Sequence, residues 1–323
     1  MPRPELTAQL PHTLRQTDFG DGLGSLYRGK VRDTYAKGDH LVLVTTDRLS
    51  AFDRVLTTVP FKGELLNRLA AFWFEKTKDL VPNHLLDLPD PNVAVARKCE
   101  ALPVEVVVRG HLTGSLWRDY TAGRHGAYGV SVPEGMKKDQ AFDKPIITPS
   151  TKAQAGAHDE PISEAEILAR GLVGERDWRR ACESALALFE AGRAWAASRG
   201  LILVDTKYEF GLQGGTLYVI DEIHTMDCSR YWMADEYADR FARGVDQRML
   251  DKENIRQWLI GERGFQGHGE PPAIPDEVRV DLAEKYAAAW EQIVGEPLKL
   301  EVGDPLPRLR ENLTRKGYLP APA

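Results

Sequence analysis

The segment from Leu201 to Gly211, with the sequence LILVDTKYEFG, constrains the fold more than any other part of the chain. Its short apolar run and aromatic residues predict a strand. Because side chains alternate across a strand, Asp205, Lys207 and Glu209 share one face of it. Three charges on one face of an apolar strand indicate a functional surface, or else a solvated face in which Lys207 neutralises its neighbours.

A second predicted strand, Leu217 to Ile223, brings another carboxylate to this region. If Asp221 lies opposite Glu209, the two carboxylates repel each other, and a divalent cation such as Mg²⁺ removes that penalty. A regular two-residue turn at Gly214-Gly215 would put Asp221 on the wrong face. We therefore predict a loop of odd length or a bulge in this hairpin, and a metal site at Glu209 and Asp221.

Two basic residues lie in a β-rich run near the N-terminus, from Ser25 to Tyr35. Lys30 and Arg32 are expected to point the same way on a strand, and Gly29 lets the backbone approach a ligand closely. This pattern is typical of a hairpin over a polyphosphate, and also of a solvated edge strand. Neither a Walker A loop nor a dinucleotide-binding glycine motif is present.

The strand predicted over Val104 to Val108 ends at Arg109 and passes into a loop rich in glycine and hydroxyl groups. The planar guanidinium of Arg109 suits a phosphate or a carboxylate, and Ser115 can add a hydrogen bond. An ordinary surface turn with an incidental arginine explains the same residues. His111 is by default a structural or exposed histidine.

Polar loops at Thr46 to Asp53 and at Thr148 to Lys152 hold many groups that can bind a metabolite, or that simply favour turns. Elsewhere we predict a helix over residues 64–79, a long loop over 131–161, and a loosely held tail over the first 15 or so residues. Strands mixed with helices indicate an α+β or α/β enzyme. The motifs of serine hydrolases, zinc proteases and protein kinases are absent from the sequence.

The charge balance argues against a protein that coats nucleic acid. The 323 residues include 42 Lys and Arg against 48 Asp and Glu, a net charge of −6, whereas affinity for a polyanion comes from clustered basic residues. The three cysteines are widely spaced and support neither a disulfide framework nor a zinc knuckle. With no bilayer-spanning apolar window and no apolar leader, we expect a cytoplasmic protein without a nucleic-acid or membrane partner.

Two long motifs closely resemble the SAICAR synthetase family of purine biosynthesis: LPVEVVVRGHLTGS at residues 102–115 and LVDTKYEFG at residues 203–211. The resemblance covers Tyr27 to Trp232, and Ala101, where a larger apolar residue is expected, departs from it without touching the chemistry. It implies ATP-dependent ligation of L-aspartate to 5-amino-1-(5-phosphoribosyl)imidazole-4-carboxylate, giving SAICAR, ADP and phosphate.

The resemblance also implies an α+β fold with two lobes, ATP-grasp-like or kinase-like. A nucleotide-binding lobe would span residues 1–108, and a lobe with the substrate and metal site would span residues 109–323, with a helical extension from about residue 237. Another ATP-dependent carboxylate–amine ligase, a small-molecule kinase and a non-catalytic nucleotide-binding regulator stay open as alternatives.

The family positions assign roles to particular residues of this chain. Asp205 and Lys207 match the catalytic region around the imidazole carboxylate, and the segment from Ser150 to Asp159 is our candidate for binding L-aspartate. The remaining implied contacts are the ATP phosphates at Lys30 and Arg32, the adenine-facing hinge at Lys98 to Val104, Mg²⁺ at Glu209 and Asp221, the ribose phosphate at Arg109, Ser115 and Arg230, and the imidazole region at Ser50 and Asp53.

Overall fold

The computed structural model describes residues 1–52, 54–152, 160–250, 253–265, 267 and 269–321. It divides the chain into two compact units that are not consecutive halves of the sequence. The first unit contains residues 1–73, 84–98 and 251–323, and the second contains residues 74–83 and 99–250. None of the helices in the described ranges has the length and apolar character that a bilayer crossing requires.

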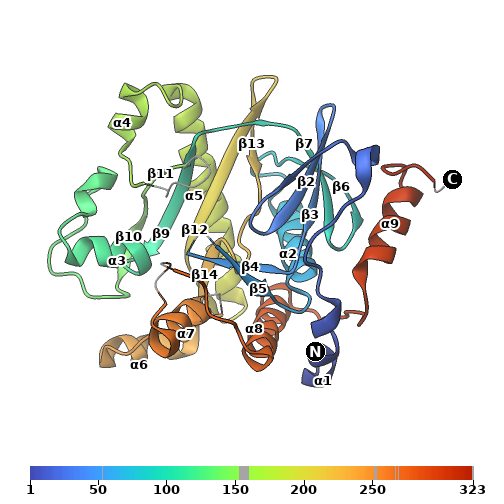
Figure 1. Cartoon of the computed structure of the whole chain (residues 1–323). Helices are drawn as coiled ribbons and strands as arrows, with labels where there is room; N and C mark the ends of the chain where they lie inside the picture. Colours follow the sequence, from blue (N-terminus) through green and yellow to red (C-terminus); the bar gives the residue numbers. More distant parts are fainter. Residues whose placement is uncertain (53, 153–159, 251–252, 266, 268, 322–323) are drawn as a thin grey trace. The chain divides into compact units, whose positions relative to one another are not determined.

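The first unit is built on an antiparallel five-stranded sheet with the strand order β1-β2-β3-β7-β6 (Figure 1). Its strands are β1 Ser25–Arg28, β2 Arg32–Lys37, β3 His40–Thr45, β6 Leu85–Asp90 and β7 Val93–Arg97, with the separate hairpin β4 Arg48–Ala51 and β5 Arg54–Thr58. Its helices are α1 Arg3–Ala8, most of α2 Lys62–Thr77, α7 Glu253–Arg263, α8 Asp276–Val294 and α9 Pro305–Arg315. The helix predicted over residues 64–79 is therefore confirmed as α2.

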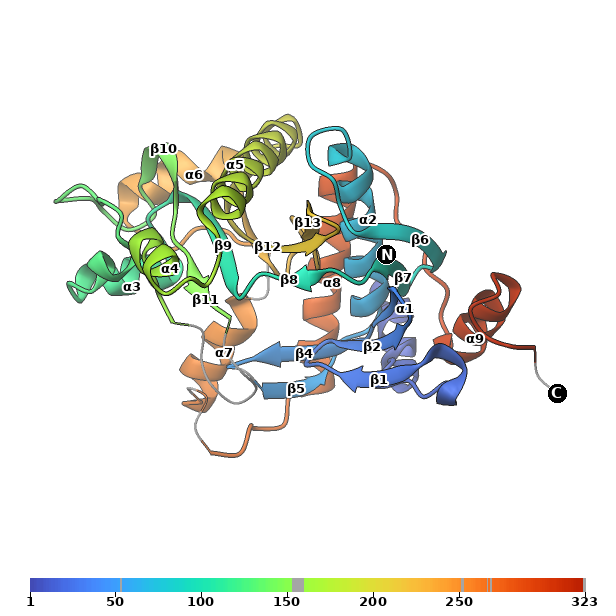
Figure 2. The ribbon, with the colours of Figure 1, turned by 90° about the horizontal axis from the view of Figure 1, so that it is seen from above.

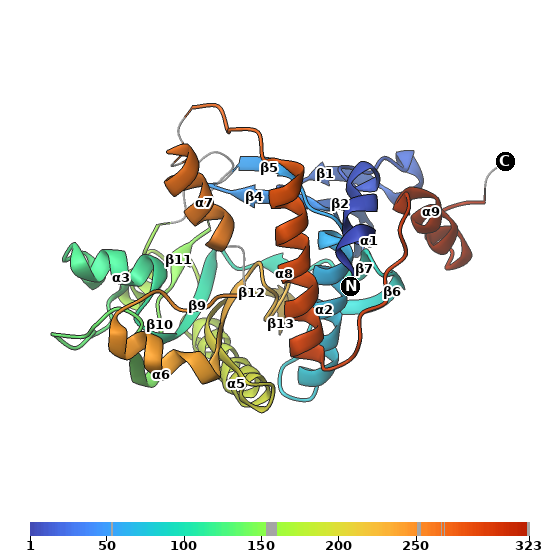
Figure 3. The same cartoon turned by 90° about the horizontal axis from the view of Figure 1, so that it is seen from below.

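The N-terminal residues are packed, so the predicted loose tail is wrong. Helices α1, α2 and α8 lie side by side (Figure 3): α1 contacts α8, and Lys62 of α2 lies over the ring of Tyr286 in α8. Leu6 and Leu14 are almost fully buried. These two apolar side chains lie among polar neighbours in the sequence, and their burial in tertiary contacts holds the segment in place.

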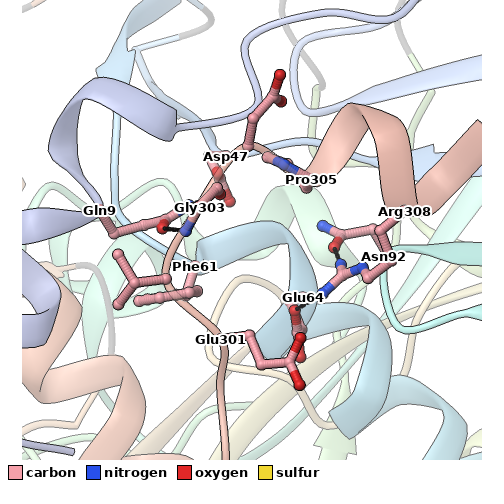
Figure 4. Close-up of a pocket in the computed structure, with 11 residues that line it drawn as sticks. Gln9, Asp47, Phe61, Glu64, Asn92, Glu301, Gly303, Pro305 and Arg308 are labelled. Atoms are coloured by element: carbon pink, nitrogen blue, oxygen red, sulfur yellow. Dashed lines mark hydrogen bonds and ion pairs between the residues drawn. The ribbon is translucent and has the colours of Figure 1, made fainter.

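The C-terminal segment is held against the rest of the first unit by buried polar contacts. The loop before α9 borders a cavity of about 100 Å³ (Figure 4). Arg308 donates hydrogen bonds to Glu64 at 3.0 Å and to Asp90 at 3.1 Å. The amide of Gln9 donates to the carbonyl of Gly303 at 3.0 Å and accepts from its N–H at 2.8 Å. Because these groups bond to one another, we interpret the cavity as part of a structural joint.

The second unit is built around the 13-residue strand β12, which has neighbours on both edges. Strands β14 and β13 pair with one edge of β12, and β9 and β8 pair with the other. Helix α5 packs along the sheet against β12 and β9 (Figure 2). The strands are β8 Glu100–Ala101, β9 Val104–His111, β10 Ala141–Ile147, β11 Ser150–Thr151, β12 Leu201–Gln213, β13 Thr216–Ile220 and β14 Ser229–Met233, and the helices are α3 Gly114–Thr121, α4 Glu164–Ala169, α5 Glu175–Ser198 and α6 Ala234–Arg243.

Residues 131–161 are not a long loop throughout, because β10 and β11 lie within this range. Both strands pair with β9. Pro145 and the exposed charges of β10 are accommodated because β10 is an edge strand with a register shift, where a missing N–H or an exposed charge is tolerated.

Candidate active site

Five charged side chains meet on one face of the sheet in the second unit. The ammonium nitrogen of Lys207 lies 3.1 Å from a carboxylate oxygen of Glu105 and 3.9 Å from one of Asp221, and it also contacts Glu209. Lys152, directly after β11, contacts the other oxygen of Glu209. Three carboxylates against two ammonium groups leave a net negative charge, which suits a further cation.

The predicted register of the β12–β13 hairpin is wrong. A regular two-residue turn at Gly214-Gly215 joins the strands, and Glu209 pairs with Ile220 instead of Asp221. Asp221 lies one residue beyond the end of β13, and its backbone is left-handed, with φ of 67°. Such a backbone conformation is rare for a residue other than glycine, and it breaks the strand alternation. Both carboxylates therefore reach Lys207 although the register alone would separate them.

Glu209 and Lys207 hold each other in their charged forms. Burial on its own would raise the pKa of Glu209, but Lys207 and Lys152 together hold that pKa well below its ordinary value. Burial would lower the pKa of Lys207, but Glu209, Glu105 and Asp221 together hold it well above its ordinary value. The cluster therefore keeps ionised oxygen donors and an ammonium group at neutral pH.

The cluster fits one particular mode of Mg²⁺ binding. Within the ranges that the structure describes, no group of three or more His, Cys, Asp or Glu side chains is arranged to hold an ion without further ligands. Mg²⁺ is usually bound by one or two protein carboxylates together with water and substrate phosphates. The pair Glu209 and Asp221 could supply the protein part of such a ligand set.

A second polar group lies further along the same strand, around the carboxylate of Asp205. The guanidinium of Arg109 on β9 donates to Asp205 at 3.3 Å, to Ser115 at 3.1 Å and to Thr148 at 2.7 Å. Arg230 on β14 donates to the same oxygen of Asp205 at 2.5 Å. The structure thus brings together Arg109, Ser115 and Arg230, the three residues matched to the ribose phosphate. Asp205, which was matched to the imidazole region, lies between the two arginines.

Only glycine fits where α3 begins beside Arg230. Gly114 has φ of 58°, and a Cβ atom built on it would lie 2.3 Å from the guanidinium nitrogens of Arg230. The close approach places the first turn of α3 directly beside the two guanidinium groups. A helix N-terminus with two arginines and the hydroxyl of Ser115 is an arrangement that binds phosphate.

In the first unit, the turn between β1 and β2 carries the two basic residues predicted to face phosphates. The expected single strand over residues 25–35 is instead a hairpin, with Lys30 in its turn and Arg32 at the start of β2. The N–H of Gly29 donates to the carbonyl of Arg32 at 2.8 Å and closes the turn. Strand alternation was therefore the wrong argument for placing Lys30 and Arg32 together, although both belong to one tight turn.

The other predicted residues are less closely defined by their local contacts. Ser50 lies on β4, and Asp53 falls outside the described residues. Lys98 is the last residue before the chain passes into the second unit, and its N–H donates to Asp39 at 2.9 Å. Of the segment proposed to bind L-aspartate, the described part is Ser150 to Lys152.

Sequence reasoning missed three contributors to these clusters. Glu105 shares a face of β9 with Arg109, so the alternation used for β12 would have found it. Lys152 and Thr148 lie in a loop recognised as polar, but only the pairing of β11 with β9 and the contact of Thr148 with Arg109 show what they touch.

Comparison with known proteins decides the family. A profile of SAICAR synthetase matches residues 25–271. The chain belongs to the SAICAR synthetase family. The phosphoribosylaminoimidazole-succinocarboxamide synthase of Bacteroides fragilis is 48% identical over 306 residues, covering 93% of this chain and 97% of the relative. The enzyme of the same name from Cytophaga hutchinsonii is 46% identical over 309 residues, covering 94% and 99%.

Solved structures of the SAICAR synthetase family confirm the predicted α+β fold. The SAICAR synthase of Saccharomyces cerevisiae, solved in complex with SAICAR, is 33% identical with a TM-score of 0.76, covering 89% of this chain and 100% of that one. The chain is thus an ATP-dependent carbon–nitrogen ligase that joins L-aspartate to the phosphoribosyl aminoimidazole carboxylate in purine biosynthesis. This favours the ligase over the kinase and the regulator that the sequence left open.

Proposed function

We propose that one face of β12 holds the phosphoribosyl substrate at one end and the reacting phosphoryl group at the other. One observation carries this proposal: Asp205 and Lys207 lie on the same face of β12. Asp205 is bonded to two arginines, and Lys207 is paired with three carboxylates. At about 3.3 Å per residue, the backbones of Asp205 and Glu209 are about 13 Å apart along the strand. A substrate with its phosphate at the arginines can extend its carboxylate toward Lys207.

The reaction we propose runs through an acyl phosphate. An oxygen of the imidazole carboxylate attacks the γ-phosphorus of ATP, and ADP leaves with the electrons of the broken bond. The amine of L-aspartate then attacks the acyl carbon, the amide forms, and phosphate and the amine proton are released. Phosphoryl transfer needs positioning and charge neutralisation more than a protein nucleophile. The charged strand face supplies both.

Arg109, Arg230 and Ser115 bind the ribose phosphate in this scheme. Two guanidinium groups with parallel donors match the oxygens of a phosphate. Asp205 holds the two arginines together before substrate binds, so their mutual repulsion does not open the site. The N-terminus of α3 adds its N–H groups to the same anion.

Glu209 and Asp221 would hold Mg²⁺, which when bound neutralises charge on the transferring phosphoryl group. Lys207 lies between the two carboxylates and keeps them close through its own charge. Its ammonium group also provides a fixed positive charge beside the substrate carboxylate. Asp205 and Lys207 are therefore the residues that we place nearest to the chemistry.

The remaining roles rest on the family positions, except that of the segment from Ser150 to Asp159, which we chose for its polar composition. We assign Lys30 and Arg32 to the ATP phosphates, Lys98 to the adenine-facing hinge, Ser50 and Asp53 to the imidazole region, and the segment from Ser150 to Asp159 to L-aspartate. The complex of the yeast relative with SAICAR supports this choice of substrate class. We place the reaction in the cytoplasm, where ATP and phosphoribosyl metabolites are supplied, and propose small molecules as the only partners that the chemistry requires.

A coupled assay of ADP release tests the proposed function. Release should require both L-aspartate and the imidazole carboxylate, because ATP is consumed to activate the carboxylate for the amine. The controls omit one substrate at a time or replace the imidazole compound with another carboxylate. Turnover with a different carboxylate and none with this one would overturn the substrate assignment and leave the ligase class standing.

A further inference from the structure

Arg48, the first residue of β4, is buried, and its side chain holds the β1–β2 turn by bonding to main-chain carbonyls of that turn. Only 6% of the surface of this residue is exposed to solvent. The guanidinium donates to the carbonyl oxygens of Gly29 at 2.9 Å, Lys30 at 3.2 Å and Arg15 at 2.6 Å. It also lies 2.8 Å from a carboxylate oxygen of Asp33. An arginine with this many main-chain acceptors fixes the path of the backbone more than it fixes any side chain.

Two neighbours complete the attachment of the turn. Thr46 donates to the carbonyl of Val31 from its hydroxyl at 2.8 Å and from its N–H at 3.0 Å. Asp33, the partner of Arg48, is fully buried and accepts from the N–H and the hydroxyl of Thr17. The carbonyls of three successive residues, 29 to 31, are therefore bonded to Arg48 and Thr46, which are themselves held in the core.

The planarity of the peptide bond gives this contact a consequence for ligand binding. Within a trans peptide, the N–H points opposite to the carbonyl of the preceding residue. The N–H groups of Lys30 and Val31 therefore both point away from the guanidinium of Arg48. Successive N–H groups that point the same way favour an anion. The charged side chains of the turn and its main chain are thus oriented for the same kind of ligand.

We propose that Arg48 is a positioning residue for the nucleotide. By holding the carbonyls of the β1–β2 turn, it keeps Lys30, Arg32 and the adjacent N–H groups in the arrangement that accepts the ATP phosphates. This inference rests on the proposed nucleotide role of Lys30 and Arg32. A purely structural role of the pair Arg48 and Asp33 would lower stability without changing the KM for one substrate alone.

The test compares two variants of this network with a matched control, all in the full chain. Arg48→Lys keeps a charge for Asp33 but cannot reach several carbonyls. Thr46→Val removes one hydrogen bond to the turn, and also the acceptor of the Arg48 N–H at 3.4 Å, with little change in shape. In Arg68→Lys the changed side chain also donates to a main-chain carbonyl of the first unit, that of Lys299 at 3.1 Å, and it lies on α2, which contains neither the turn nor Arg48. Thermal unfolding confirms that each variant is folded.

For Arg48→Lys we expect the KM for ATP to rise about tenfold, with kcat and the KM for L-aspartate within about twofold of the parent, because the loss is one of positioning. Thr46→Val should raise the KM for ATP about threefold, in line with the loss of one hydrogen bond. Arg68→Lys should leave it unchanged.

An unchanged KM for ATP in both folded network variants would overturn the inference. If Arg48→Lys does not fold, Thr46→Val decides alone. Lys30→Ala, measured beside them, separates this inference from the proposed function. If Lys30→Ala raises the KM for ATP while the network variants do not, only the role of Arg48 fails. If Lys30→Ala has no effect either, the nucleotide assignment of the whole turn fails.

Discussion

The β12 face of the second unit and the β1–β2 turn of the first unit are both rich in charge, but they are built differently. On β12, charged side chains contact one another, as Lys207 contacts Glu209 and Glu105. At the turn, Arg48 of β4 donates to main-chain carbonyls and so holds the backbone that carries Lys30. We therefore expect substitutions that change a charge on β12 to alter the chemical step, and substitutions of the residues that hold the turn to alter nucleotide binding.

The largest expected effect comes from neutralising a carboxylate of the β12 cluster. Glu209→Gln or Asp221→Asn should lower kcat by about a thousandfold, because the proposed Mg²⁺ site loses one of its two carboxylates beside the transferring phosphoryl group. The fold should survive, since Lys207 keeps two carboxylate partners in either variant. Turnover at saturating ATP and Mg²⁺, measured beside Tm, checks both statements.

The matched control for this prediction is Glu164→Gln, in which the changed carboxylate accepts a hydrogen bond from Trp178 elsewhere in the second unit. It should leave kcat unchanged. If Glu209→Gln and Asp221→Asn instead melt much lower and the folded fraction is fully active, the carboxylates are structural and the contrast between the two regions disappears.

An intermediate effect is expected where α3 meets Arg230. Gly114→Ala should raise the KM for the phosphoribosyl substrate about tenfold, because the new methyl group displaces the guanidinium from the proposed phosphate site. The control is Gly123→Ala, which also has a left-handed backbone, with φ of 69°, but has open space around the added carbon. Steady-state kinetics with each substrate varied in turn provides the measurement.

Both glycine variants carry the backbone cost of a Cβ atom in the left-handed region, of the order of 1 kcal/mol. Both Tm values should therefore fall, that of Gly114→Ala by more because its added carbon also displaces Arg230 from Asp205, and only Gly114→Ala should change the KM. Equal kinetics in the two variants would show that Arg230 does not bind the phosphate, and the β12 face would lose one of its two proposed ends.

The smallest effect is an opposite pH dependence of stability in the two units. Burial lowers the pKa of His111 in the second unit to about 4, so its contribution to stability is full above about pH 6.5 and is lost as the pH falls toward 4. Burial raises the pKa of Asp47 in the first unit to about 6, although the N–H groups of Gly63 and Leu14 oppose this shift. Its contribution is full below about pH 3.9 and is lost as the pH rises toward 6.

Urea unfolding between pH 4 and 6.5 tests these two opposite dependences of the free energy of unfolding on pH. Relative to the parent chain, His111→Gln should lose less stability on acidification, and Asp47→Asn should lose less as the pH rises through the same range. Parallel curves for the parent and both variants would contradict the assignment of these two buried groups as the source of opposite slopes.

Much of the fold and of the β12 face could be predicted because short-range rules govern them. Alternation placed Asp205, Lys207 and Glu209 on one face, and apolar spacing predicted α2. The strand from Val104 to Val108 was predicted from its β-branched run, but it does not end at Arg109 as expected and continues to His111. The packed N-terminal segment was missed because the burial of Leu6 depends on α8, which lies far away in the sequence.

By itself, the sequence determined which charged residues line β12 and which family the chain resembles, because both depend on local order along the chain. Only the tertiary structure decided that Asp221 reaches Lys207. The two-residue turn sets a register that would put the two residues on opposite faces, and the left-handed backbone at Asp221 brings its carboxylate back to Lys207. It also decided that Arg48 holds the carbonyls of Gly29 and Lys30. A main-chain acceptor has no signature in the sequence, because every residue carries one and only the fold determines which donor lies beside it.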